Sequence, residues 1–114
     1  MELAMEKVSL TDLAREHLAT ARSTSNGRSA HTAVGGHGHV LRQTVIAMVG
    51  GQELEEHNSP GEATLQVVHG RVRLVAGEVS CEGSSGDLLI IPPARHRLLA
   101  LDDAVVLLTV AKTS

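Results

Sequence analysis

Histidines give this chain its clearest potential for metal chemistry, and two of the seven stand one residue apart. His37 and His39 are separated by Gly38. On an extended strand alternate residues point to the same side, so the two imidazoles would face the same way. This H-x-H spacing suits a divalent metal, for which the neutral imidazole is a common ligand. Because the segment is rich in glycine, a flexible polar loop is the alternative interpretation.

Arginines beside another histidine offer a second kind of chemistry. Arg95 and Arg97 flank His96, and a guanidinium presents a planar donor fork to a carboxylate. Only one of the two can face inward on a strand. The alternative is that both face solvent and pair with the nearby Asp102 and Asp103.

Covalent and phosphoryl chemistry have no support in the sequence. Cys81 is the only cysteine and alternates with Val79, which favours a small buried apolar group over a nucleophile. No Ser-His-Asp arrangement, phosphate-binding glycine loop or zinc-type cysteine pair can be found by spacing. A lone cysteine also rules out an intrachain disulfide, which is typical of a reducing cytoplasm.

Composition restricts the classes of ligand and partner. Of the 114 residues 42% are apolar, and none is Phe, Tyr or Trp. The core and any pocket must therefore be aliphatic, and no aromatic ring can stack on a sugar or a base. The formal net charge is -3 and the ten basic residues are scattered, so no nucleic-acid partner is expected. No apolar run approaches the roughly 20 residues of a membrane span, so we expect a soluble chain without a membrane partner.

The elements that must position these side chains begin with one helix. Apolar residues recur at helical spacing between positions 10 and 21 and predict an amphipathic helix over about Thr11 to Arg22. Residues 23–38 are rich in Ser, Asn, Gly, Thr and His, which predicts a linker or arm. We therefore divide the single domain into an N-terminal helix with a polar arm, residues 1–39, and a β-barrel, residues 40–114.

Seven short runs beyond residue 40 predict an antiparallel sandwich or barrel, because turns join them and no helix intervenes. The runs are Leu41–Val49, Glu62–Val68, Arg71–Ala76, Glu78–Glu82, Asp87–Ile91, Arg97–Leu101 and Ala104–Ala111. In the second run Ala63, Leu65 and Val67 share one face, which should be dry. The unbroken apolar stretches Leu88–Ile91 and Val105–Leu108 should be covered on both faces.

Two stretches of the chain resemble the sequence motifs of the RmlC-like cupin superfamily. The stretch from Gly51 to Gly70 resembles the first motif, G-x5-H-x-H-x3,4-E-x6-G. The stretch from Gly86 to His96 resembles the second, G-x5-P-x-G-x2-H-x3-N. With the flanking strands the likeness covers about residues 40–111. It implies a small single-domain bacterial cupin, an all-β antiparallel double-sheet jelly-roll β-barrel, here with one N-terminal amphipathic helix.

The resemblance also implies where a metal would bind. In the family, two histidines and a glutamate of the first motif and one histidine of the second converge on a divalent metal inside the barrel. Here His57 and His96 fill two of these four positions, whereas Ser59 replaces the second histidine and Ala63 falls at the glutamate position. The motifs are therefore degenerate, and two imidazoles need a third ligand for a stable site.

Three residues are candidates for that third ligand: Glu62, His37 and His39. Glu62 adjoins the glutamate position and could turn inward at a bulge, which would give a two-histidine, one-carboxylate set suited to iron. Its alternative is a solvated carboxylate at a strand end. One divalent metal, zinc, iron, nickel or manganese, would be bound, and no organic cofactor is expected. The other histidines are expected to be exposed: His17, His31 and His69.

The sequence leaves three functions open. The first is binding of a small, mainly apolar molecule in the barrel, with His57, Ser59 and His96 as polar contacts beside Ala63 and Leu65. The second is a metal-dependent enzyme of the dioxygenase or isomerase type, for which no catalytic residue can be named. The third is a structural or regulatory homodimer without pocket chemistry. A homodimer is expected in any case, with exchange of the arm.

Overall fold

The computed structural model describes residues 3–58 and 61–112, and of Glu56 and His57 it describes the backbone alone. One helix, α1 (Leu10–Ser23), precedes the strands. The strands are β1 (Arg28–Val34), β2 (Leu41–Met48), β3 (Glu53–His57), β4 (Gly61–His69), β5 (Arg71–Ala76), β6 (Val79–Ser84), β7 (Leu88–Ile90), β8 (His96–Ala100) and β9 (Ala104–Lys112). The predicted helix and all seven predicted strands are present, with ends that differ by at most two residues.

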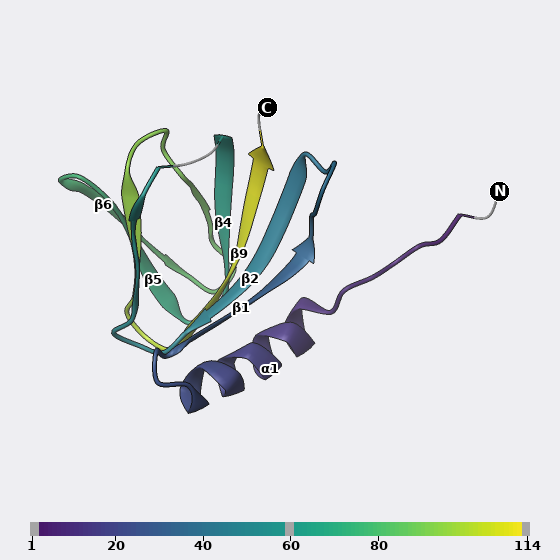
Figure 1. The fold of residues 1–114 in the computed structure, drawn as a ribbon. Coiled ribbons are helices and arrows are strands. Elements are labelled where there is room, and N and C mark those ends of the chain that lie inside the picture. The colour runs from purple at the N-terminus through teal and green to yellow at the C-terminus, as the bar shows by residue number, and fades with distance from the viewer. Residues whose placement is uncertain (1–2, 59–60, 113–114) are drawn as a thin grey trace.

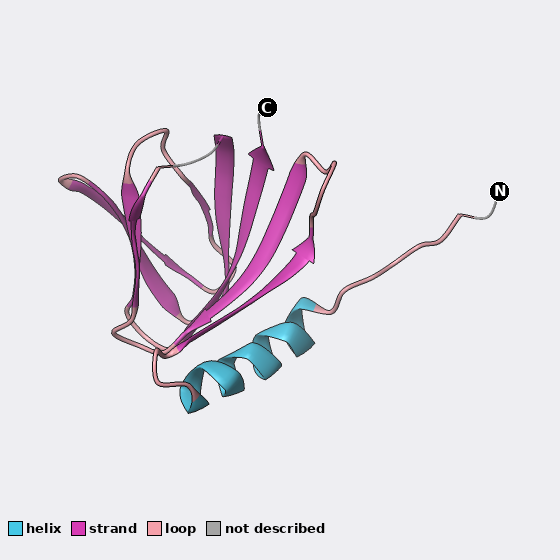
Figure 2. Ribbon diagram, in the orientation of Figure 1, coloured by secondary structure: helices cyan, strands magenta, loops and turns pink. Residues whose placement is uncertain are grey.

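The strands form two facing antiparallel sheets (Figures 1 and 2). A five-stranded sheet has the order β1-β2-β9-β4-β7, and a four-stranded sheet has the order β3-β8-β5-β6. Between the described strands no pairing joins one sheet to the other. The predicted jelly roll is therefore a two-sheet sandwich and is not closed into a barrel.

The main core lies between the sheets and is aliphatic. Along β4 the predicted alternation is present, because Ala63, Leu65 and Val67 are buried while Glu62 and Gln66 are exposed. The core also takes side chains from β2, β5, β7, β8 and β9: Ile46, Met48, Val72, Leu74, Leu89, Leu98, Ala100, Val106 and Val110. Burial of this aliphatic surface is the main favourable contribution to folding.

Helix α1 packs on the outer face of the five-stranded sheet (Figure 1). The Ser9 side chain caps its first turn by accepting a hydrogen bond from the Asp12 amide at 3.2 Å. The apolar stripe of the helix contacts β2 and β9 through Ala14, Leu18, Ala21, Val45, Ala47, Val105 and Leu107. Strand β9 is thus covered on both faces, as its unbroken apolar run predicts. In the described part of the chain no helix has both the length and the apolar character of a bilayer span.

Two strands were not predicted, and both are polar. Residues 28–34 were expected to be part of an arm but form the edge strand β1, which pairs with β2 from Arg28↔Met48 onward. An edge strand exposes one side to solvent, so serine, threonine and histidine are tolerated there. Strand β3 was missed because three carboxylates surround Leu54, its one aliphatic residue.

Two expectations about burial were wrong. Leu88 and Ile90 are 58% and 71% exposed because β7 is an edge strand whose outer face α1 does not cover. Cys81 and Val79 are exposed rather than buried. The reason is that β6 is the other sheet's edge, and the tip of the β5–β6 hairpin extends outward from the two sheets (Figure 1).

Candidate functional site

His96 brings a polar ring into the aliphatic interior. It is the first residue of β8, it is 3% exposed, and it alternates inward with Leu98 and Ala100. Its Nδ1 lies 2.9 Å from the carbonyl oxygen of Ala94. Because a carbonyl only accepts hydrogen bonds, Nδ1 is the donor in this contact.

The backbone of β3 lies beside His96 in the four-stranded sheet. Glu53 pairs with Leu99 and Leu54 with Leu98, but the register then shifts so that residue 57 pairs with His96. A β-bulge between Leu54 and His57 produces this shift by inserting one extra residue in β3. The side chain of His57 and the whole of Ser59 lie outside the described residues, so their predicted roles stay predictions.

The other predicted pocket residues lie on the facing sheet. Ala63 and Leu65 are 7% and 3% exposed and belong to the same core cluster as Leu98. Leu54 and Leu108 are partly buried against this cluster. The described inner surfaces near the site are therefore aliphatic, as the composition predicts.

The structure does not bring the three candidate third ligands together with His96. Glu62 is exposed and faces away from Ala63, because the β4–β9 register is continuous from Gly61 to Val67 and lacks the bulge that would turn Glu62 inward. His37 and His39 are exposed in the connection between β1 and β2. Among the residues that are described, no group of three or more metal-ligating side chains occurs.

The arginines beside His96 also lie outside the interior. Arg97 points to the other face of β8, where its Nη1 is 3.3 Å from Glu53 Oε2, and Arg95 is exposed. The expected pairing with Asp102 and Asp103 was wrong. Those carboxylates bind arginines that lie far away in the sequence: Asp102 binds Arg71 at 3.0 Å and Asp103 binds Arg22 at 2.9 Å.

One histidine outside the motifs differs from its expected exposure. His17 is half-buried where α1 meets β1, and its Nδ1 lies 2.7 Å from the Ser29 hydroxyl. Its ring centroid is 5.4 Å from that of His31. His31 and His69 are exposed, as expected. The interaction of His17 with β1 could not be foreseen, because no pattern in residues 28–34 indicates a strand.

Two ion pairs on the surface of the four-stranded sheet shift the pKa values of their own side chains and lie outside the interior. A hydrogen bond from Arg73 lowers the pKa of Glu82 below its ordinary value. A hydrogen bond to Asp102 raises the pKa of Arg71. Both pairs lie on exposed side chains of the four-stranded sheet and its adjoining turn, so they stabilise the surface and take no part in the site around His96.

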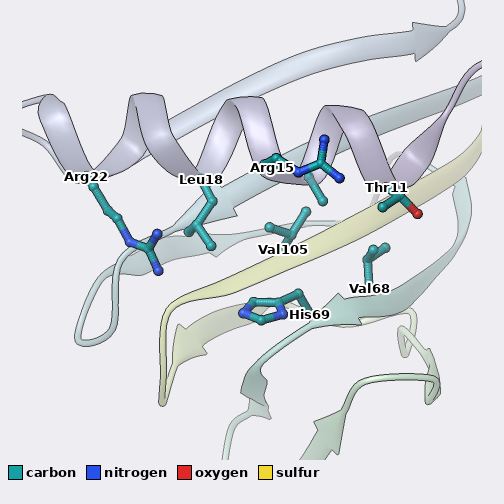
Figure 3. Close-up of a pocket in the computed structure, with 8 residues that line it drawn as sticks. Thr11, Arg15, Leu18, Arg22, Val68, His69 and Val105 are labelled. Carbon is teal, nitrogen blue, oxygen red and sulfur yellow. The ribbon is translucent and has the colours of Figure 1, made fainter.

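A groove that the sequence did not predict lies on the other side of the five-stranded sheet. It has a volume of about 390 Å³ and runs between α1 and strands β4 and β9 (Figure 3). Its floor is formed by Ala14, Leu18, Val68 and Val105. The apolar helix stripe was a signal for this surface, but only the fold shows that the helix leaves part of the sheet open.

No known family model matches the sequence, and no curated protein does. Solved structures do match. A conserved protein of unknown function from Streptococcus pyogenes is 25% identical, with 80% of this chain and 79% of that chain covered and a TM-score of 0.71. A Cupin 2 conserved barrel domain protein from Salinispora arenicola is 18% identical, with 98% and 92% covered and a TM-score of 0.68. The chain has the cupin fold.

One further match relates this chain to part of a larger one. Salicylate 1,2-dioxygenase from Pseudoaminobacter salicylatoxidans is 18% identical with a TM-score of 0.74. The match covers 88% of this chain but only 34% of the dioxygenase chain. At this identity the likeness establishes the fold alone.

Proposed function

We propose that this cupin binds a small, mainly apolar molecule between its two sheets, with His96 as a polar contact. The observation that carries the proposal is that, among the described residues, His96 is the one buried polar side chain and the core around it is aliphatic. Burial of a polar ring costs free energy unless its nitrogens are satisfied. Nδ1 lies 2.9 Å from the carbonyl oxygen of Ala94, and the buried ring gives the aliphatic core a group that can form hydrogen bonds.

We further propose that His57 and Ser59 supply the remaining polar contacts, beside Ala63 and Leu65. The pairing of residue 57 with His96 in the β3–β8 ladder supports a shared role for the two histidines. The bulge that creates this pairing supports it as well, because bulges are over-represented next to active sites. An aliphatic cavity with a few convergent polar groups is typical of small-molecule sites.

A metal-dependent enzyme of the dioxygenase or isomerase type is the second candidate. The favouring observation is the same β3–β8 pairing, since His57 and His96 would be two ligands for zinc, iron, nickel or manganese. The dioxygenase among the similar structures gives the candidate its reaction class. The described residues contribute one such ligand, His96, and a stable site needs at least three. We therefore derive no catalytic step through a metal.

Metal content and ligand binding together test the two candidates. Protein purified without chelators is analysed for metal by plasma mass spectrometry, and native mass spectrometry searches for a co-purified small molecule. The same measurements are made on His57→Ala and His96→Ala. Stoichiometric metal that is lost in both variants would replace the first candidate with the second.

A conservative variant isolates the role of the His96 ring nitrogens. His96→Leu replaces the imidazole with an aliphatic side chain of similar size and so removes the hydrogen-bonding atoms. Affinity for a co-purified ligand, or for hydrogen-bonding aliphatic alcohols and acids used as probes, should fall about tenfold. Thermal unfolding verifies that the variant is folded. Equal affinity of wild type and His96→Leu would show that the His96 ring does not contact the ligand.

We also propose that the chain forms a homodimer that covers the outer side of the five-stranded sheet. Leu88 and Ile90 support this proposal, since both are large, apolar and exposed on that side. If the dimer forms but no ligand or metal binds, the structural or regulatory function is the remaining interpretation. The cytoplasmic location, inferred from the single cysteine, stays a prediction.

A further inference from the structure

The segment before α1 carries apolar side chains that nothing in the described part of its own chain covers. Residues 3–8 are extended and project away from the two sheets (Figure 1). Leu3 is 87% exposed, Met5 is 97% exposed and Val8 is 45% exposed. Alternate residues of an extended segment point to one side, so Leu3 and Met5 share a face. Exposure of these apolar side chains to water is unfavourable, and burial of that face against another surface would lower the free energy.

The groove beside α1 offers a surface of matching chemistry. Its floor is aliphatic, and Arg15, Arg22 and His69 form a basic rim (Figure 3). Arg22 is paired with Asp103, whereas the Arg15 side chain is 73% exposed and interacts with Asp12 at the surface. The apolar face of residues 3–8 can therefore meet the floor.

The segment and the groove also match in length. Thr11 and Arg22 line the two ends of the groove, and eleven helical steps span about 17 Å. Leu3 to Val8 spans about 17 Å when extended. The segment carries one charge of each sign, Glu6 and Lys7, so the match rests on its length and its apolar side chains.

The geometry at Ser9 favours the groove of another molecule over the groove of the same chain. Ser9 has an extended backbone, with φ of -83° and ψ of 105°. Its side chain caps α1 by accepting a hydrogen bond from the Asp12 amide. From this residue the segment continues away from the sheets (Figure 1). To enter its own groove the chain would have to reverse direction at Ser9, which would disrupt the cap.

We propose that residues 3–8 of one copy lie in the α1 groove of a second copy, and that the exchange is reciprocal. A two-fold axis makes such an exchange self-complementary, because each copy donates one segment and receives one. This inference rests on the proposed homodimer and names the surface that holds it together.

Disulfide trapping between two different variants tests which chain the segment contacts. Cys81→Ser removes the native thiol, and Met5→Cys and Val68→Cys are then made in separate chains. Mixing the two variants under mild oxidation should give a cross-linked pair, identified by mass spectrometry of the joined peptides. Met5→Cys mixed with Val79→Cys is the matched control, because Val79 is accessible but lies on the other sheet.

The same pair of cysteines placed in one chain tests whether the segment lies in its own groove. If Met5→Cys and Val68→Cys in a single chain form a disulfide within that chain at high dilution, the segment lies in its own groove and the proposal fails. It fails equally if the mixed variants cross-link no faster than the Val79 control.

Sedimentation separates this inference from the homodimer itself. Leu3→Ser combined with Met5→Ser should raise the dimer dissociation constant by at least about a hundredfold, and Val79→Ser should leave it unchanged. A dimer that stays equally tight without Leu3 and Met5 overturns the exchange but keeps the homodimer. A wild-type chain that is monomeric at micromolar concentration overturns both.

Discussion

The carboxylate of Asp103 accepts a hydrogen bond from Arg22 Nε at 2.9 Å, across 81 positions of sequence. The same carboxylate accepts a second hydrogen bond from the Gly50 amide at 2.8 Å. Asp103 therefore joins the last turn of α1 to the turns that follow β2 and β8. Removal of this carboxylate should loosen the helix from the sheet.

Asp103 should make stability depend on pH in the acid range. The Gly50 amide, and then Arg22, lower the pKa of Asp103 below its ordinary value of 3.8. A carboxyl group whose pKa is lower in the folded state stabilises the fold at higher pH and loses that contribution as pH falls through the folded pKa. We expect Asp103→Asn to cost about 1 kcal/mol at pH 7 and to flatten the decline in unfolding free energy below about pH 4.

Urea unfolding between pH 7 and pH 3 measures this effect. The control is Asp102→Asn, because Asp102 is more exposed and pairs with Arg71 at the surface. It should change the pH profile less than Asp103→Asn does. Identical profiles for wild type and Asp103→Asn would contradict the role of this carboxylate.

Gly70 should tolerate no larger residue. Its φ is +82°, and a Cβ there would collide with the carbonyl oxygen of Asp103 and lie 2.9 Å from the Cα of Ala104. We expect Gly70→Ala to cost about 3 kcal/mol or more in unfolding free energy, since strain and steric clash add.

The matched substitution is Gly77→Ala. Gly77 also has a positive φ, of +60°, but apart from its chain neighbours no described atom lies within 4 Å of the position that a Cβ would take. Only the left-handed backbone cost of about 1–2 kcal/mol should remain. Chemical denaturation measures the unfolding free energy of both variants. If Gly70→Ala and Gly77→Ala lose the same amount, the backbone around Gly70 accommodates a Cβ without additional cost.

Helix α1 should contribute stability through Leu18. This side chain is 7% exposed against the outer face of the five-stranded sheet. We expect Leu18→Ala to lower the unfolding free energy by about 2–4 kcal/mol, from lost burial and a new cavity. Val79→Ala, on an exposed side chain of the other sheet, should change it by less than about 0.5 kcal/mol. A small loss at Leu18 would mean that the helix is only loosely attached.

The Arg73–Glu82 pair of the β5–β6 hairpin should determine the pKa of Glu82. Arg73 lowers the pKa of Glu82 by a hydrogen bond and by its charge. In Arg73→Ala the pKa of Glu82 should rise toward its ordinary value of 4.5. Titration of the Glu82 side chain by NMR measures the change. An unchanged pKa would mean that this exposed pair does not persist in solution.

Hydrophobic spacing and the turn residues between the runs were sufficient to predict α1 and seven strands, and most of these elements bury an apolar face. Ala63, Leu65 and Val67 were placed on the dry face of β4 for this reason. Strands β1 and β3 were missed because polar residues at sheet edges leave no such spacing. The exposure of Leu88 could not be foreseen either, since it depends on which strand lies at the edge.

The candidate site was predictable only where the family resemblance supplied positions. His96 is buried, and Ala63 and Leu65 are buried on the facing sheet, while their role as pocket residues stays a prediction. Glu62 is exposed, because its inward turn required a bulge in β4, whereas the register of β4 is continuous from Gly61 to Val67 and the irregularity near His96 lies in β3. Register irregularities depend on pairing between distant strands, so a single sequence does not disclose them.

The bulge in β3 decides which residue type stands beside the buried imidazole. If the register of Leu54 and Leu98 continued unbroken, Glu56 would pair with His96, and the extra residue puts position 57 there instead. The spacing along β3 between Leu54 and residue 57 therefore fixes which backbone position of the first motif is paired with the interior ring of His96.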